Sequence, residues 1–261
     1  MNLPEALDAE SDLTCVVGAG GKKTTLYALA DRLGGEGRTS GRDGTGRAAG
    51  TAGGRPVVTA TVRIPIFDAH VAEVVVTDDP VAALRSADRF PLGLVPERER
   101  EDRYRGYDAE TVGTIAAAHD GPVLVKADGA RTRWLKAPDE REPQVPATAD
   151  TVVPIASARV VGESLAEGHV HRPERVAALA GREVGDGIRP ADVAAVLASD
   201  DGGLKGVAEG ATAIPVVNMV DSPELEDVAR EIADEVLARA DVPRVALTRM
   251  VADDPVVAVV E

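Results

Sequence analysis

A glycine-rich segment near the start of the chain has the residue types of a phosphate-binding loop. Glycines let backbone N–H groups converge on an anion, a lysine reaches the outer phosphates of a nucleotide, and a threonine hydroxyl binds Mg²⁺. These residue types follow one another in Gly18, Ala19, Gly20, Gly21, Lys22, Lys23, Thr24 and Thr25. We therefore predict that this segment binds the phosphates of a nucleotide.

The segment departs from the standard P-loop pattern, G-x-x-x-x-G-K-[ST], at two places. Lys23 stands where a hydroxyl residue is expected, and the first glycine lies closer to the lysine than the pattern requires. One interpretation is that Lys22 binds phosphate and Thr24 binds the metal. Another is that Lys23 and Thr24 form the functional pair in a distorted loop. The non-functional alternative is a turn with two solvated lysines.

Asp128 is the second candidate ligand for Mg²⁺. It follows an apolar run, 123–125, that predicts a buried strand beside the glycine-rich segment. Ligands of open parallel sheets bind at the carboxyl ends of strands, where P-loop proteins place the carboxylate that orients Mg²⁺. We expect Thr24 and Asp128 to hold Mg²⁺, and Lys22, Asp128 and Arg131 to form the catalytic group. Asp128 is alternatively a simple turn residue before Gly129.

A late pair of polar residues predicts base recognition. Asn218 and Asp221 follow an apolar run, 213–217, at the spacing with which GTP-binding proteins contact guanine. Met219 stands where those proteins have a lysine. The alternative interpretation is an asparagine turn followed by an ordinary capped helix start at Ser222 and Pro223.

Lysine is scarce in this chain, and its placement is uneven. The lysines are Lys22, Lys23, Lys126, Lys136 and Lys205. Two lie in the glycine-rich segment and two flank the Asp128 segment, so chance placement explains them poorly. We assign a substrate-side role to Lys126, Arg131, Lys136 and His171. For His171 we favour contact with a substrate phosphate over a zinc site shared with His169.

The composition limits the function classes. Acidic residues outnumber basic ones 44 to 29, which gives a net charge of -15 and a pI near 4.7. Such a surface suggests adaptation to high salt and argues against nucleic acid or an anionic membrane as a partner. Aromatic residues make up 2% of the chain, which disfavours recognition of bases by stacking platforms. Without a signal peptide pattern or a long apolar run, the sequence predicts a cytoplasmic protein.

The elements that position these residues predict an α/β fold. We expect a P-loop NTPase-like, doubly wound and mostly parallel sheet flanked by helices, in a single domain over residues 1–261. Helices are expected at 79–87, 172–179, 190–197 and 223–240, and strands at 244–247 and 256–260. The Gly- and Arg-rich stretch 34–55 lacks large apolar residues, so it predicts a disordered surface insertion.

Taken together, the motifs of the chain resemble those of the YqeC family. The matching segments are 17–22, 59–61, 123–131, 135–138 with 142–143, 170–174, 203–205 and 215–221. The resemblance implies an accessory role in selenium cofactor biosynthesis, or in maturing the cofactor of a molybdenum hydroxylase. It also implies GTP or ATP with Mg²⁺ as ligands, a potential Mg²⁺-dependent NTPase activity, and the molybdopterin cofactor and the hydroxylase as partners.

The chain departs from the family pattern at two places, one of which is the strand end 59–61, where the family is usually richer in threonine. The family usually has an acid where Lys126 stands, in a Glu-Ala-Asp-Gly motif that includes Asp128. If that acid works with Asp128 on a metal, the departure affects hydrolysis more than binding, because Lys126 can itself meet a phosphate. The alternative function is therefore a chaperone that binds a molybdopterin dinucleotide without hydrolysis.

Overall fold

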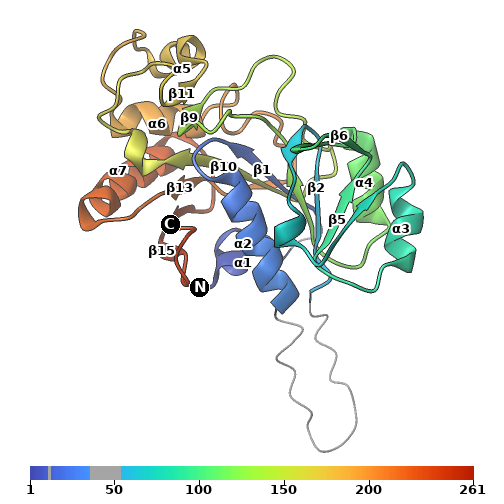
Figure 1. Cartoon of the computed structure of the whole chain (residues 1–261). Coiled ribbons are helices and arrows are strands. Elements are labelled where there is room, and N and C mark those ends of the chain that lie inside the picture. Colours follow the sequence, from blue (N-terminus) through green and yellow to red (C-terminus); the bar gives the residue numbers. More distant parts are fainter. Residues whose placement is uncertain (11–12, 36–53) are drawn as a thin grey trace, which may run out of the picture.

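A ten-stranded sheet forms the centre of the computed structural model, which describes residues 1–10, 13–35 and 54–261 (Figure 1). Its strand order is β15-β14-β13-β10-β1-β8-β2-β5-β4, and β12 pairs with β10 beside this path. The pairs are parallel except β14–β15, which is antiparallel. The strands are β1 (Leu13–Gly18), β2 (Val57–Ala60), β4 (Glu73–Val76), β5 (Leu92–Val95), β8 (Val123–Lys126), β10 (Thr151–Ser157), β12 (Thr212–Ala213), β13 (Val216–Asn218), β14 (Val245–Thr248) and β15 (Val256–Val260).

Helices cover both faces of this sheet (Figure 1). On one face lie α1 (Leu3–Ala6) and α2 (Lys22–Gly35), and on the other lie α3 (Pro80–Ser86), α4 (Ala109–Ala117), α5 (Pro173–Ala180), α6 (Pro190–Leu197) and α7 (Pro223–Arg239). Short 3-10 helices occur at η2 (Asp68–His70) and η3 (Ala158–Val160). The predicted α/β fold with a large, mostly parallel sheet flanked by helices is therefore confirmed.

The apolar run of β1 shows why a parallel sheet forms here. Val16 packs with Leu26 and Leu29 of α2, while Cys15 and Val17 belong to the cluster on the opposite face. Because helices cover both faces, successive side chains of the strand are all buried, and the run need not alternate with polar residues.

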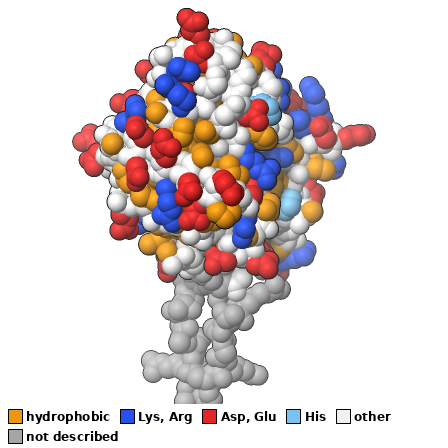
Figure 2. All heavy atoms as spheres, turned by 90° about the vertical axis from the view of Figure 1, so that its left-hand side faces the viewer, with side chains coloured by type: hydrophobic (Ala, Val, Ile, Leu, Met, Phe, Trp, Pro, Cys, Tyr) orange, Lys and Arg blue, Asp and Glu red, His pale blue; other side chains and the backbone are white. Residues whose placement is uncertain are grey.

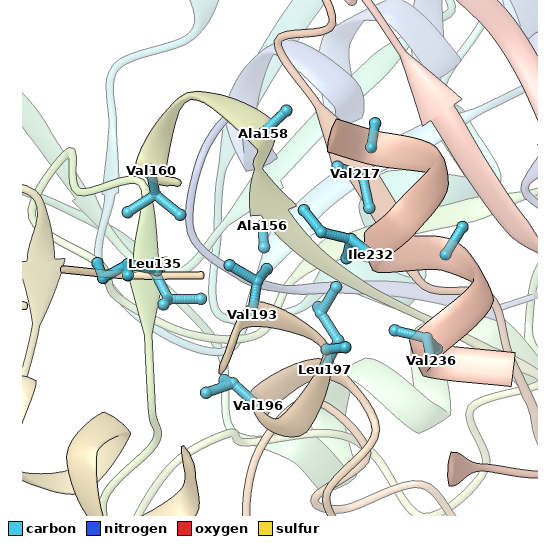
Figure 3. Packing of buried hydrophobic residues seen from close by; sticks show 14 of the residues in the cluster. Leu135, Ala156, Ala158, Val160, Val193, Val196, Leu197, Val217, Ile232 and Val236 are labelled. Carbon is cyan, nitrogen blue, oxygen red and sulfur yellow. The ribbon is translucent and has the colours of Figure 1, made fainter. Parts of the chain in front are cut away.

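A second core lies between the sheet and helices α6 and α7. There Val193 and Leu197 of α6 meet Ile232 and Val236 of α7, and Val217 of β13 packs against them (Figure 3). The outer surface formed by this side of the molecule mixes acidic, basic and apolar side chains without a large patch of one kind (Figure 2).

One central strand departs from sequence expectation. We did not predict β10, although it pairs directly with β1. Its run contains Pro154, which has no N–H to donate and normally argues against a central strand. Here Pro154 lies opposite Val17 and the strand remains fully buried.

Two smaller sheets lie beside the main one. A parallel pair joins β9 (Leu135–Lys136) and β11 (Val170–His171). An antiparallel group has the order β3-β7-β6, formed by β3 (Ile64–Pro65), β7 (Arg103–Arg105) and β6 (Glu97–Arg100). The charged run after residue 96 thus forms a hairpin whose side chains are mostly exposed.

The predicted insertion at 34–55 is partly outside the described residues. Gly34 and Gly35 belong to the last turn of α2, so the helix extends further than predicted. Residues 36–53 are not described, and the prediction of disorder there stays a prediction. Within the described parts of the chain, the helices are too short or too polar to cross a membrane.

Candidate functional site

The predicted phosphate-binding segment joins a strand to a helix at the carboxyl edge of the sheet. Strand β1 ends at Gly18 and α2 begins at Lys22. Gly18 has φ 89°, and a Cβ there would lie 2.3 Å from the carbonyl oxygen of Ile155. Only glycine fits a position that combines a left-handed backbone with such a close approach.

The loop's own N–H groups bond within the protein. The N–H groups of Gly18, Ala19 and Gly20 donate to Asp128 Oδ2, to the carbonyl of Ile155 and to the carbonyl of Arg133, at 2.9, 2.8 and 2.9 Å. The first turn of α2 differs, because the leading N–H groups of a helix have no partner inside it. The backbone donors of this motif that could hold an anion are therefore those at the start of α2 rather than those of the glycine loop.

Lys22 lies behind the loop in a buried ion pair. Its Nζ is 2.9 Å from Asp128 Oδ1 and also donates to the Gly18 carbonyl. Lys22 is 6% exposed and Asp128 is 1% exposed. Burial lowers the pKa of Lys22, although Asp128 opposes this effect. Burial alone would raise the pKa of Asp128, but the ammonium groups of Lys22 and Lys136 hold it below its ordinary value.

The ion pair continues outward as a chain of alternating charges. Lys136 Nζ lies 2.8 Å from Asp128 Oδ2 and 2.7 Å from Glu142 Oε2. Arg172 then pairs with Glu142 at 2.8 Å and with Asp139 at 2.6 Å. Six charges of both signs thus compensate one another, and this series of ion pairs links the glycine loop to the start of α5.

An open pocket of about 850 Å³ adjoins the start of α2. Its walls come from the segments 20–24 and 129–134, together with Val62, Arg63, Pro65, Arg103, Lys126, Glu142 and Met219. The basic residues of this lining are Lys22, Lys23, Arg63, Arg103, Lys126, Arg131 and Arg133, whereas Glu142 is the acidic residue among the described ones. A chain with a net charge of -15 therefore presents a strongly basic pocket.

Three of these cations are available for a ligand. Within the described residues, Lys23, Arg131 and Arg133 form no ion pair with an acid, whereas Arg63 pairs with Glu99 at 2.6 Å. Lys23 and Arg131 were predicted from the sequence, whereas Arg63, Arg103 and Arg133 were not. Arginine is common along the chain, so their residue type alone did not distinguish them.

Lys126 forms a buried part of the pocket wall. Its Nζ donates to the carbonyls of Arg63 at 2.9 Å and Asp128 at 2.7 Å. Burial lowers the pKa of Lys126 to about 7, and the ammonium of Lys22 adds to this effect. The further charges that act on it are Asp128, Lys136 and Glu142.

We expect the affinity for a polyanion to fall as the pH rises through 7, because Lys126 loses its proton there. Because one charged contact is lost, the affinity should be roughly tenfold lower at about pH 9 than at about pH 6. Titration of tripolyphosphate into wild type and Lys126→Arg at each pH measures the effect, since arginine keeps its charge and the ligand's own ionisation cancels. Parallel pH profiles for the two proteins would contradict this role for Lys126.

The predicted base-binding pair does not line this pocket. Asn218 is buried, and its Nδ2 donates to the Gly20 carbonyl at 2.7 Å. Its Oδ1 accepts from Thr248 Oγ1 and from the N–H of Met250. Asp221 pairs with Arg159 at 2.7 Å. In this structure Asn218 therefore supports the glycine loop, and the recognition of guanine by the pair stays a prediction.

The two predicted metal ligands, Thr24 and Asp128, have different surroundings. Thr24 is exposed in the pocket, while Asp128 Oδ2 is taken by Lys136 and the Gly18 N–H, and Oδ1 faces Lys22. Over the described residues, no group of three or more His, Cys, Asp and Glu side chains is arranged to hold a metal ion. A Mg²⁺ ion at Asp128 would have to displace an ammonium group, so the metal role stays a prediction.

Two further candidates, Thr25 and His171, do not line the pocket. Thr25 is buried, and its Oγ1 donates to the Gly21 carbonyl at 3.2 Å. His171 is paired in register with Lys136 across β9 and β11. Burial lowers the pKa of His171 to about 4, and the neighbouring Arg172 adds to this effect. His171 is therefore neutral at pH 7.

Comparison with known proteins identifies the family. The family model described as YqeC protein matches residues 14–174. The chain is 26% identical over 206 residues to "Uncharacterized protein YqeC" of Escherichia coli (strain K12), which covers 78% of this chain and 74% of that protein. No solved structure matches the chain.

Proposed function

Because the chain belongs to the YqeC family, we propose that it is a nucleotide-binding accessory protein for maturation of a selenium- or molybdenum-containing cofactor. The client in this proposal is a molybdenum hydroxylase, as the sequence resemblance implies. The ligand is GTP or ATP, and its phosphates lie in the basic pocket at the start of α2.

The concentration of cations in one pocket carries this proposal. The surface of an acidic chain repels anions in general. Seven basic residues around one opening therefore contrast with the acidic charge of the chain as a whole. Helix α2 adds the partial positive charge of its N-terminus and its free leading N–H groups. Phosphate oxygens are the ligand atoms that match such donors.

The available cations define how the phosphates would be held. Lys23 and Arg131 reach the ligand without giving up an acidic partner, and Arg133 stands beside them. Lys22 contributes as a buried charge behind the loop, since its Nζ is already engaged by Asp128 and Gly18. Thr24 offers a hydroxyl at the same opening.

One observation favours the second candidate, a chaperone that binds a molybdopterin dinucleotide without hydrolysis. The carboxylate of Asp128 is compensated by Lys22 and Lys136, and Lys126 stands beside it. These ammonium groups occupy the surroundings in which an NTPase would hold Mg²⁺. Binding without turnover needs no such metal.

Calorimetric titration of the full chain tests both candidates. We would titrate GTP, ATP and a molybdopterin dinucleotide, each with Mg²⁺ and with EDTA, and measure phosphate release in parallel. Lys23→Gln should weaken binding roughly tenfold, because one charge-assisted contact is lost. Arg85→Gln removes an exposed cation on α3, away from the pocket, and serves as its control.

The outcomes separate the two candidates. Mg²⁺-dependent binding of a triphosphate with phosphate release supports the NTPase. Tight binding of the dinucleotide in EDTA, with no phosphate release from GTP or ATP, supports the chaperone. If none of the three ligands binds, the proposed function is overturned.

A further inference from the structure

The pocket contains the only tryptophan of the chain. Trp134 lines the pocket and is half-buried, immediately after the basic segment that contains Arg131 and Arg133. Its indole ring stacks on the imidazole of His169, with ring centroids 4.4 Å apart and an interplanar angle of 30°. An amphipathic ring at the wall of a charged pocket can contact a flat ligand group by stacking or edge contact.

The backbone holds Trp134 firmly in place. Its N–H donates to the His169 carbonyl at 2.8 Å, and its carbonyl accepts from the Ser157 N–H at 3.0 Å. The same carbonyl lies against the glycine loop, where a Cβ on Gly20 would approach it to 3.0 Å. These bonds fix the Trp134 backbone next to the segment at which the phosphates would bind, and the stacking on His169 holds its ring, so a ligand would meet a preorganised ring.

The segment before Trp134 has an unusual backbone. Arg131 and Thr132 have φ angles of 46° and 60°, in the left-handed region that favours glycine. This conformation is especially uncommon for a β-branched residue such as Thr132. The N–H of Arg133 donates to the Ala130 carbonyl at 2.9 Å and closes the turn. Strain of this kind persists at binding sites where the surroundings enforce it.

The size of the pocket indicates more than a phosphate group. About 850 Å³ falls in the upper part of the range of small-molecule sites. A short polyphosphate would occupy the basic part and leave the wall at Trp134 without a contact. Asn218 and Asp221, the residues predicted to bind a base, do not line the pocket. Among the described residues that do line it, Trp134 is the aromatic one, so it is the candidate contact for a flat ring.

We infer that Trp134 is a specificity-determining residue, which contacts a flat heteroaromatic ring of a phosphate-bearing ligand. This inference rests on the proposed function and deepens it. The pocket takes a nucleotide or a pterin–nucleotide compound rather than a simple polyphosphate or acyl phosphate. The low aromatic content still disfavours nucleic acid, which needs successive stacking rings, whereas one ligand ring needs one partner.

The experiment compares a ring-bearing ligand with a bare polyphosphate. GTP, ATP and tripolyphosphate would be titrated into wild type, Trp134→Leu and Trp134→Phe by calorimetry at matched salt and pH. Because Trp134 is the only tryptophan, its fluorescence in the wild type reports directly on the ring's surroundings. Thermal unfolding by circular dichroism shows whether the variants are folded.

We expect the better nucleotide to bind roughly tenfold tighter than tripolyphosphate, and to change the Trp134 fluorescence. Trp134→Leu should lose that advantage while its affinity for tripolyphosphate is unchanged, and Trp134→Phe should keep most of it. A structural role would instead weaken both ligands together.

Two results overturn the inference. One is an unchanged ratio of nucleotide to tripolyphosphate affinity in Trp134→Leu. The other is nucleotide binding to the wild type without any change in its tryptophan fluorescence, which is informative even if the variant does not fold. In both cases the proposed phosphate binding survives. If neither nucleotides nor tripolyphosphate bind to the wild type, this inference falls, and the proposed function then depends on binding of the molybdopterin dinucleotide.

Discussion

We expect Asp128→Asn to destabilise the protein by about 3–5 kcal/mol, because it removes the charge that compensates two buried lysines. Lys22 and Lys136 both lie within 3 Å of the Asp128 carboxylate, at 2.9 and 2.8 Å. The asparagine is similar in size, so the loss arises from the charge rather than from packing. Thermal or urea unfolding of the two proteins measures it, and the expected fall in Tm is about 10 °C.

A matched control lies at the outer end of the same ion-pair chain. The side chain of Asp139 is 25% exposed and pairs with Arg172 at 2.6 Å, so Asp139→Asn should cost less than about 1 kcal/mol. The double variant Lys22→Met with Asp128→Asn should be less destabilised than the sum of its single changes, because it no longer buries an uncompensated ammonium. Equal costs for Asp128→Asn and Asp139→Asn would contradict the central position of Asp128.

The same substitution should change the acid sensitivity of the fold. Since the folded state lowers the pKa of Asp128, this group contributes stability that is present above its ordinary pKa and is lost as the pH falls below it. Glu142, whose pKa the Lys136 and Arg172 partners lower against the effect of burial, contributes in the same direction. In Asp128→Asn, unfolding free energy measured against pH should therefore decline less steeply below about pH 4.

The local part of the site could be predicted from the sequence. An apolar run before Gly18 and a helical pattern after Lys22 predict β1 and α2, because each pattern is local and spans only a few residues. The apolar run before Asp128 likewise predicted β8, and β8 pairs with β1 as expected. Asp108 likewise caps the start of α4, where its side chain accepts from the Thr111 N–H at 2.8 Å.

The remainder of the site depends on contacts between distant segments. The sequence gives no sign that Asn218 donates to the glycine loop, because that contact joins residues 198 positions apart. Arg103 reaches the pocket through the small sheet in which β7 pairs with β3, and short strands of this kind have weak patterns. Pro154 argued against a central strand at β10, although this strand brings Ser157 beside Trp134. The positions of these residues depend on tertiary contacts, which local sequence patterns do not reveal.

We also expect a double charge reversal, Arg131→Glu with Arg133→Glu, to weaken polyanion binding by roughly a hundredfold or more, because two charge-assisted contacts are lost and repulsion replaces them. Arg131 is exposed and Arg133 is half-buried, and neither pairs with an acid among the described residues. The fold should therefore keep its Tm. Calorimetry with GTP, ATP and tripolyphosphate measures the loss.

The control for this reversal is Arg230→Glu with Arg239→Glu on α7, which changes the net charge equally but lies away from the pocket. If the pocket binds through local contacts, this control should keep nearly wild-type affinity, and only the pocket variant should lose it. The wild-type affinity should also fall as salt rises, and the pocket variant should respond less, because fewer charged contacts remain to be screened. Equal losses in both variants would mean that the overall charge of an acidic chain governs anion binding, and the pocket would then lose its special role.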